Sequence, residues 1–206
     1  MTAARDTVMR RIRDALGPAP AAPEAVPRGY RQAGGPVAFD PVERFAEVVA
    51  DYDATVHRVA AAGLEDALGR CCRERGATRI AVPPGLPWRL AGVESIVDDP
   101  PLGARDLDAI DGVLTGCAVA IAETGTIVLD GGPGQGRRAL SLVPDYHLCL
   151  LQAGQIVGIV PEAMDRLPPG RPCTWISGPS ATSDIELDRV QGVHGPRTLE
   201  VILIEP

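Results

Sequence analysis

The chain has 206 residues, 45% of them hydrophobic, which suits one domain with a sizeable core. Its net charge of −7 argues against non-specific nucleic-acid binding, because that function needs a basic surface. All twenty basic side chains are arginine. The absence of lysine excludes a lysine Schiff base, a pyridoxal phosphate anchor and a Walker-type phosphate lysine, each of which needs the amine.

Hydropathy and cysteine spacing further narrow the class of protein. No apolar run approaches the roughly 20 residues that a bilayer requires, and the N-terminus has no apolar signal core, so we expect a cytoplasmic protein without a membrane span. The cysteines form no CxxC pair and no closely spaced ligand set, which favours free thiols over a metal site or a cluster. They are Cys71, Cys72, Cys117, Cys149 and Cys173.

The N-terminal region reads as an arm. Residues 2–16 predict a short amphipathic helix with Val8, Ile12 and Leu16 on one side. Residues 17–36 are rich in Pro, Ala and Gly, which is typical of a linker. We therefore expect an arm and linker over 1–36 and a folded domain over 37–206. The arm is expected to dock on its own domain, on a second copy in a homo-oligomer, or on another protein.

The first half of the folded domain alternates between helix and strand. Asp40 is a candidate N-cap before a proline at the first helical position. The pattern predicts helices over 41–51 and 64–75 and strands over 55–59, 79–82 and 94–97. Such alternation predicts an α/β fold, with a mainly parallel sheet flanked by helices and with ligands at the carboxyl ends of its strands.

After Asp108 the helical signal fades and short apolar runs dominate. They predict strands over 112–122, 126–130, 147–152, 173–177 and 199–204. The glycine-rich insert 131–136 predicts a mobile loop, with the candidate anion-binding residues Arg137 and Arg138 at its far end. Its proline and the lack of a following helix argue against a dinucleotide motif, so no bound NAD or FAD is expected.

The stretch AVAIAETGT, residues 118–126, offers a candidate catalytic carboxylate. Glu123 ends a predicted strand, beside a turn formed by Thr124, Gly125 and Thr126, whose backbone N–H groups could meet an anion. A general base or a carboxylate nucleophile is one interpretation. The alternative is a structural ion pair with one of the two arginines that follow the glycine-rich insert.

Two later motifs add hydroxyl, imidazole and guanidinium groups. The SGPS run places Ser177, Gly178 and Ser180 after a strand and before a helical turn predicted over 183–187. Such a junction suits an anion, although a plain capped turn is the alternative. In GVHGPR, His194 is a candidate proton carrier, with Gly195 beside it and Arg197 placed to grip a carboxylate.

The other two histidines carry less signal. His147 lies in the apolar run PDYHLCLLQ, which is typical of a hydrogen-bonded strand histidine rather than a catalyst. His57 lies in another predicted strand, with no chemistry-bearing neighbour in sequence.

Several of these motifs, in order and at suitable spacing, resemble the lactate utilization protein C family of LUD-domain proteins. The matching residues are IAETGT at 121–126, Arg138 with Ser141, Pro144 and His147, SGPSATSDIEL at 177–187, and GVHGPR at 192–197. The resemblance implies a fold similar to sugar-phosphate isomerases, glucosamine-phosphate deaminases and class I coenzyme A transferases. It also implies a role in oxidising L-lactate to pyruvate with partner subunits that carry the iron–sulfur clusters.

Three hypotheses about function follow. The first is an accessory subunit of a lactate-oxidising complex, with no cofactor of its own and a cleft for a small carboxylate at Arg138, the Ser177 loop and the His194 loop. The second is a stand-alone isomerase or acyl/coenzyme A transferase that uses Glu123. The third is a purely structural partner protein that docks through its arm and its arginine-bearing loop.

Overall fold

The computed structural model describes residues 3–17, 26–182, 190–192 and 194–206, and it divides the chain into two units, 1–31 and 32–206. In the first unit, helix α1 (Ala3–Leu16) confirms the predicted N-terminal helix. Val8, Ile12 and Leu16 of this helix are exposed. Among the described residues, no helix is long and apolar enough to cross a membrane.

The second unit is built on a parallel sheet of six strands in the order β1-β12-β7-β4-β2-β3. The strands are β1 (Thr55–Ala60), β2 (Arg79–Val82), β3 (Glu94–Val97), β4 (Gly112–Thr115), β7 (Tyr146–Gln152) and β12 (Thr198–Glu205). Apolar residues bury both faces of the central strands, as expected for a parallel sheet with covered faces. The predicted α/β class with a mainly parallel sheet is confirmed.

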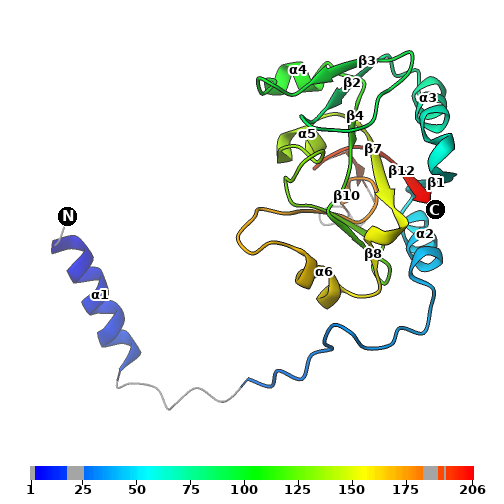
Figure 1. Ribbon diagram of the computed structural model, residues 1–206. Helices are drawn as coiled ribbons and strands as arrows, with labels where there is room; N and C mark the ends of the chain where they lie inside the picture. The colour runs from blue at the N-terminus through cyan, green and yellow to red at the C-terminus, as the bar shows by residue number, and fades with distance from the viewer. Residues whose placement is uncertain (1–2, 18–25, 183–189, 193) are drawn as a thin grey trace. The chain divides into compact units, whose positions relative to one another are not determined.

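Alternate residues of β7 serve opposite faces of this sheet. Leu148 and Leu150 pack with α3 (Leu64–Glu74), whereas Cys149 and Leu151 pack with α2 (Pro41–Asp51) and a second sheet. Figure 1 shows α3 on the opposite side of the sheet from α4 (Ala104–Asp108) and α5 (Arg138–Leu142). The predicted N-cap of α2 is also confirmed, because the Asp40 carboxylate accepts hydrogen bonds from the backbone N–H groups of Val42 and Glu43.

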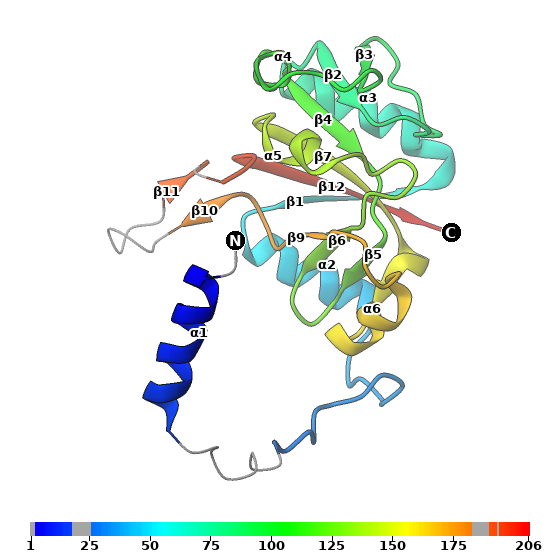
Figure 2. The same cartoon turned by 90° about the vertical axis from the view of Figure 1, so that its left-hand side faces the viewer.

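The second sheet has four strands in the order β8-β5-β6-β9. They are β5 (Val119–Ile121), β6 (Thr126–Leu129), β8 (Ile156–Val157) and β9 (Thr174–Ile176). Figure 2 shows β5, β6 and β9 with α2 and α6 (Val160–Arg166). A short antiparallel pair, β10 (Ala181–Thr182) with β11 (Val190–Gln191), follows. The helical turn predicted over 183–187 lies outside the described residues.

Three local predictions after Asp108 are wrong. The strand predicted over 112–122 breaks at Gly116, whose N–H bonds to the Gly134 carbonyl, so β4 and β5 belong to different sheets. Helices α5 and α6 are too short for a helical period to show in the sequence. The expected lack of a helix after the insert 131–136 is also wrong, because α5 follows it directly. A hydrogen bond from the Asp130 N–H to the Gln135 side chain closes the insert, whose mobility stays a prediction.

Candidate functional site

Two adjoining cavities lie where the predicted motifs converge. The larger has a volume of about 790 Å³ and the smaller about 220 Å³, and Ser141 and Thr174 line both. The larger borders Pro84 and Asp98, just beyond the carboxyl ends of β2 and β3. The smaller instead lies beside the first residues of β7 and β12. The expectation that ligands bind at carboxyl ends therefore fits the larger cavity and not the smaller.

The smaller cavity is formed mainly by the SGPS and GVHGPR motifs. Ser177, Gly178, Ser180, His194 and Gly195 all line it. The hydroxyl of Ser180 accepts a hydrogen bond of 3.0 Å from the His194 N–H, and its own N–H donates to the Pro196 carbonyl at 2.8 Å. The structure thus brings together the two motifs that the sequence predicted to share one site.

A chain of hydroxyl groups joins the AETGT turn to this cavity. Thr126 Oγ1 lies 2.7 Å from Thr124 Oγ1 on one side and 2.7 Å from Ser177 Oγ on the other. Thr126 is buried, whereas Ser177 is exposed at the cavity. The two threonines therefore act behind the cavity wall, where they orient the Ser177 hydroxyl.

His147 is a hydrogen-bonded histidine of β7, as the sequence predicted, and it also lines the smaller cavity. It lines the smaller cavity although the whole residue is 1% exposed, and its Nε2 lies 2.8 Å from the hydroxyl of Thr115. Burial lowers the pKa of His147 to about 4, because desolvation disfavours the imidazolium. The side chain is therefore a neutral imidazole near pH 7, held in orientation by Thr115.

An NMR titration checks this protonation state. We expect the imidazole resonances of His147, assigned by their loss in His147→Gln, to stay those of the neutral ring until the pH approaches about 4. Because an unfolded histidine binds a proton near pH 6.5, this site lowers folding stability as the pH falls from about 6.5 to about 4. A titration midpoint near 6.5 would contradict the buried, neutral ring.

Three arginines and two aspartates surround the larger cavity. Arg137 donates to both carboxylate oxygens of Asp98, at 2.7 and 3.0 Å, and Arg171 donates to Asp130 at 3.0 Å. Burial tends to raise the pKa of Asp98, but bonds from Arg137 and from the Leu102 N–H outweigh it, so the net pKa is lowered. Arg137, a predicted anion ligand, therefore also fixes a buried carboxylate.

Arg138 differs from the other two arginines. It lines the larger cavity, is exposed, and its guanidinium has no ion-pair or hydrogen-bond partner among the described residues. Three guanidinium groups against two carboxylates leave the cavity with one net positive charge. The arrangement is suited to an anionic ligand, as the sequence predicted for this residue.

Glycines in the first two motifs approach a helix rather than a ligand. A Cβ on Gly125, whose φ is +58°, would lie 2.8 Å from the backbone nitrogen of Val49 in α2. A Cβ on Gly178 would lie 2.6 Å from the Cβ of Tyr52, the C-cap of α2. Gly125 was predicted to belong to an anion site, but in the structure it packs closely on α2. Gly178 also packs closely on α2, and it lies in the wall of the smaller cavity as well.

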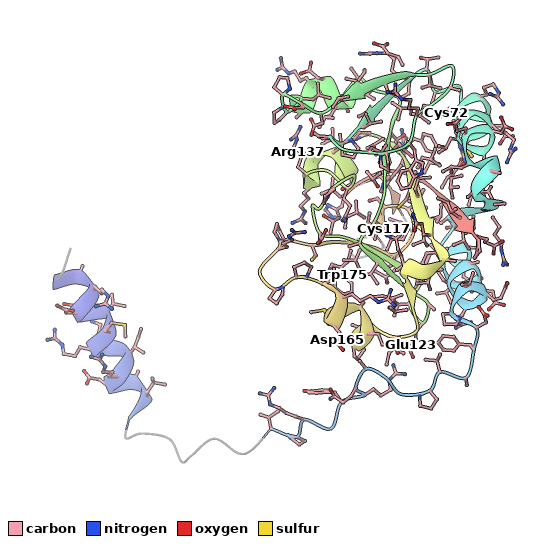
Figure 3. All side chains as sticks on the ribbon, viewed as in Figure 1. Cys72, Cys117, Glu123, Arg137, Asp165 and Trp175 are labelled. Carbon is pink, nitrogen blue, oxygen red and sulfur yellow. The ribbon has the colours of Figure 1, made fainter. Side chains whose placement is uncertain are left out.

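The candidate catalytic carboxylate, Glu123, lines neither cavity. Its backbone N–H bonds to the Gly158 carbonyl, and Figure 3 shows it at the α6 end of the domain, away from Arg137. The alternative interpretation paired Glu123 with Arg137 or Arg138, but the guanidinium of Arg137 is held by Asp98. The fold therefore places Glu123 away from the residues that line the two cavities.

Arg197 was predicted to grip a ligand together with His194. It instead forms an exposed bidentate pair with Asp145, with Nε and Nη2 within 2.9 Å of the carboxylate oxygens. It does not line either cavity. The pair ties the GVHGPR loop to the start of β7, which makes Arg197 a support for the position of His194.

A separate polar cluster lies on the opposite face of the sheet, beneath α3. Glu200 is 5% exposed in its side chain and accepts hydrogen bonds from Arg75 at 2.6 Å and from His57 at 2.9 Å. His57, Cys71 and Glu200 each offer a metal-ligand atom within 4.8 Å of the others. Because both oxygens of Glu200 are already bonded, one of them to the permanent cation of Arg75, the contacts are those of an ion-pair network.

The cysteines have the character of free thiols, as predicted. Burial raises the pKa of Cys71 to about 12, with the charge of Glu200 acting in the same direction. The pKa of Cys117 is also raised, through its hydrogen bond with Cys149 and through burial. Neutral, buried thiols of this kind are poor nucleophiles.

Comparison with known proteins agrees with these motifs. The LUD domain family matches residues 104–204. Lactate utilization protein C from Deinococcus radiodurans is 49% identical over 169 residues, which cover 79% of each chain. The uncharacterized protein YkgG from Escherichia coli is 30% identical over 66% of this chain and 67% of its own.

A solved structure supports the same assignment. The crystal structure of a DUF162 family protein from Deinococcus radiodurans is 42% identical to this chain, with a TM-score of 0.69 over 79% of this chain and 95% of its own. The family match includes both cavity-forming motifs, and the similarity extends through most of the folded domain. The chain therefore belongs to the LUD-domain family that includes lactate utilization protein C.

Proposed function

We propose that this protein serves lactate utilisation by binding a small hydroxy acid or keto acid, L-lactate or pyruvate, in the smaller cavity. The observation that carries the proposal is the meeting of His147, Ser177, Ser180 and His194 around about 220 Å³. This volume lies below the usual range for drug-sized ligands and suits a small acid. Relatives named lactate utilization protein C support the choice of acid.

The polar groups of this cavity suit both ends of such an acid. The hydroxyls of Ser177 and Ser180 and the imidazole of His194 can donate hydrogen bonds to a carboxylate. The neutral imidazole of His147 can accept a hydrogen bond from a 2-hydroxyl group. Ile176, Leu142 and Leu199 supply apolar surface for the methyl group.

In this proposal the protein is the subunit without clusters in an assembly that oxidises L-lactate to pyruvate. The electrons released by the oxidation pass to partner subunits that carry iron–sulfur clusters. Support for this division comes from the family resemblance and from the burial of four of the five cysteines. The stand-alone isomerase or transferase hypothesis is less well supported, because Glu123 lines neither cavity.

Ligand binding can be read from a residue within the cavity itself. Trp175 lines the smaller cavity and is 43% exposed, so L-lactate or pyruvate should change its fluorescence. We expect His194→Ala to weaken binding by about tenfold, as for one lost hydrogen bond to a charged group. Trp175→Phe should abolish the signal, and Arg44→Ala, an exposed change on α2, should leave affinity unchanged. Equal affinity in wild type and His194→Ala would refute the assigned site.

A pull-down tests the assembly. Tagged wild-type protein from cells grown on lactate is expected to recover cluster-bearing partners and to oxidise lactate in the eluate. His147→Gln with His194→Ala should recover the same partners with at least tenfold lower turnover. Loss of partners only on deletion of residues 1–31, with the cavity variants fully active, would favour a purely structural role.

A further inference from the structure

The larger cavity has a size and chemistry that a small acid does not explain. Its volume of about 790 Å³ lies in the upper part of the range of small-molecule sites. A ligand as small as lactate would leave most of this space to water. We therefore expect the larger cavity to bind a separate ligand, distinct from the acid in the smaller cavity.

Its cationic groups come from separate parts of the chain. Arg138 begins α5, and Arg171 lies just before β9. Arg171 uses Nη1 to hold Asp130, and its Nε and Nη2 donate to none of the described residues. Guanidinium groups that reach a cavity from different elements match an anion with oxygens in several directions, such as a phosphate, better than a single planar carboxylate.

The aspartates strengthen this arrangement rather than neutralise it. Asp98 and Asp130 are each 6% exposed, and each is committed to one arginine. The pairs hold Arg137 and Arg171 in position before a ligand arrives, which reduces the conformational entropy lost on binding. Arg138 remains as the one cavity arginine without a carboxylate partner among the described residues.

Much of the remaining wall is apolar. Pro84, Pro101, Pro133 and Pro172 line the larger cavity together with Leu129. Proline rings offer apolar surface with a fixed backbone angle, so the wall does not have to become ordered when a ligand packs against it. This surface would gain nothing from inorganic phosphate but would accommodate a ring or an acyl group.

We propose that the larger cavity binds an organic phosphate, with its phosphoryl oxygens at Arg138 and Arg171 and its uncharged part against the proline wall. Since Ser141 and Thr174 line both cavities, this ligand lies directly beside the small acid. The protein is then a two-ligand protein whose second ligand is a phosphate ester of the size of a nucleotide. The placement beside an acid rests on the proposed function, whereas the phosphate site itself does not.

Calorimetric titration of the full-length protein at constant ionic strength tests the proposal with ADP, pyrophosphate and adenosine as probes. ADP should bind at least tenfold more tightly than either other probe, because it alone meets both the arginines and the proline wall. Arg138→Ala should weaken ADP binding at least tenfold. The ADP affinity of Arg138→Lys should lie between those of wild type and Arg138→Ala, and the ADP affinity of Arg44→Ala should equal that of wild type. Since the Arg138 guanidinium has no hydrogen-bond or ion-pair partner among the described residues, its variants should fold normally, as circular dichroism would verify.

Two outcomes would overturn the proposal. One is ADP affinity that is absent or unaffected by Arg138→Ala, and the other is equal affinity for ADP and pyrophosphate. The Trp175 fluorescence assay separates this failure from failure of the proposed function, because it reports lactate in the smaller cavity. Lactate binding without ADP binding defeats only the phosphate site, and ADP binding without lactate binding defeats only the small-acid site. ADP binding that persists at saturating lactate places the two ligands side by side.

Discussion

Replacement of Glu200 by glutamine is expected to lower the free energy of unfolding substantially. The carboxylate is 5% exposed and accepts charge-assisted hydrogen bonds from Arg75 and His57. Glutamine removes the charge and leaves Arg75 without its counter-ion. We expect a loss of about 2–4 kcal/mol, less than for a fully buried pair because the Arg75 side chain is 43% exposed. Urea unfolding followed by circular dichroism measures the difference.

The same substitution should show a characteristic pH dependence. Burial tends to raise the pKa of Glu200, but hydrogen bonds from Arg75, His57 and Cys71 outweigh it, so its folded pKa lies below 4.5. The unfolded carboxyl therefore takes up a proton first as the pH falls, and the stability that Glu200 provides declines below about pH 4.5. The difference between wild type and Glu200→Gln should shrink in that range.

Glu94→Gln is the matched control for Glu200→Gln. Glu94 pairs with Arg79 at 3.6 Å, and both side chains are exposed. Its loss should cost less than about 1 kcal/mol, as for other surface pairs. Equal losses from the two substitutions would contradict the assignment of the Glu200 network as a buried stabilising element.

Gly125→Ala should also be strongly destabilising, although it adds only a methyl group. The backbone at Gly125 has a φ of +58°, and the new Cβ would lie 2.8 Å from the nitrogen of Val49. Left-handed backbone and overpacking together should cost about 2–5 kcal/mol. Because the turn connects through Thr126 to Ser177, lactate binding should weaken as well.

Gly170→Ala separates the two causes. Gly170 has a φ of +85°, but no atom lies within 4 Å of the position that its Cβ would take. It should therefore show only the conformational cost of about 1–2 kcal/mol. Thermal unfolding of both variants measures the contrast, and a Gly125→Ala protein no less stable than Gly170→Ala would show that the α2 contact is unimportant.

The strands of the sheet were predictable because their residues are buried on both faces. The runs 148–151 and 201–204 are apolar at successive positions, and they lie within β7 and β12. The break at Gly116 was not predicted, since apolar residues lie on both sides of Thr115 and Gly116 within 112–122. Whether such a run stays in one sheet depends on its backbone hydrogen-bond partners. Here the Ala118 N–H donates to the Val128 carbonyl and the Gly116 N–H donates to the Gly134 carbonyl.

The candidate site was predictable where the motif itself forms the wall. Ser177, Ser180, His194 and Gly195 were all named from sequence, and all line the smaller cavity. Arg171 was missed because nothing in its local sequence marks a function. His147 was correctly predicted as a hydrogen-bonded strand histidine, but its place in the cavity wall could not be predicted, because that wall is completed by loops far away in sequence.

What the sequence determined by itself was local and chemical: the α/β alternation, the capped helix at Asp40, the absence of lysine and the family motifs. Only the tertiary structure decided which motif residues share a cavity. It placed Glu123 away from the cavity that His194 lines, and it paired Arg197 with Asp145. It also left the guanidinium of Arg138 without an ion-pair partner among the described residues. The reason is physical, because local propensity depends on near neighbours in the chain, whereas a site depends on charges and surfaces brought together from strands and loops far apart in sequence.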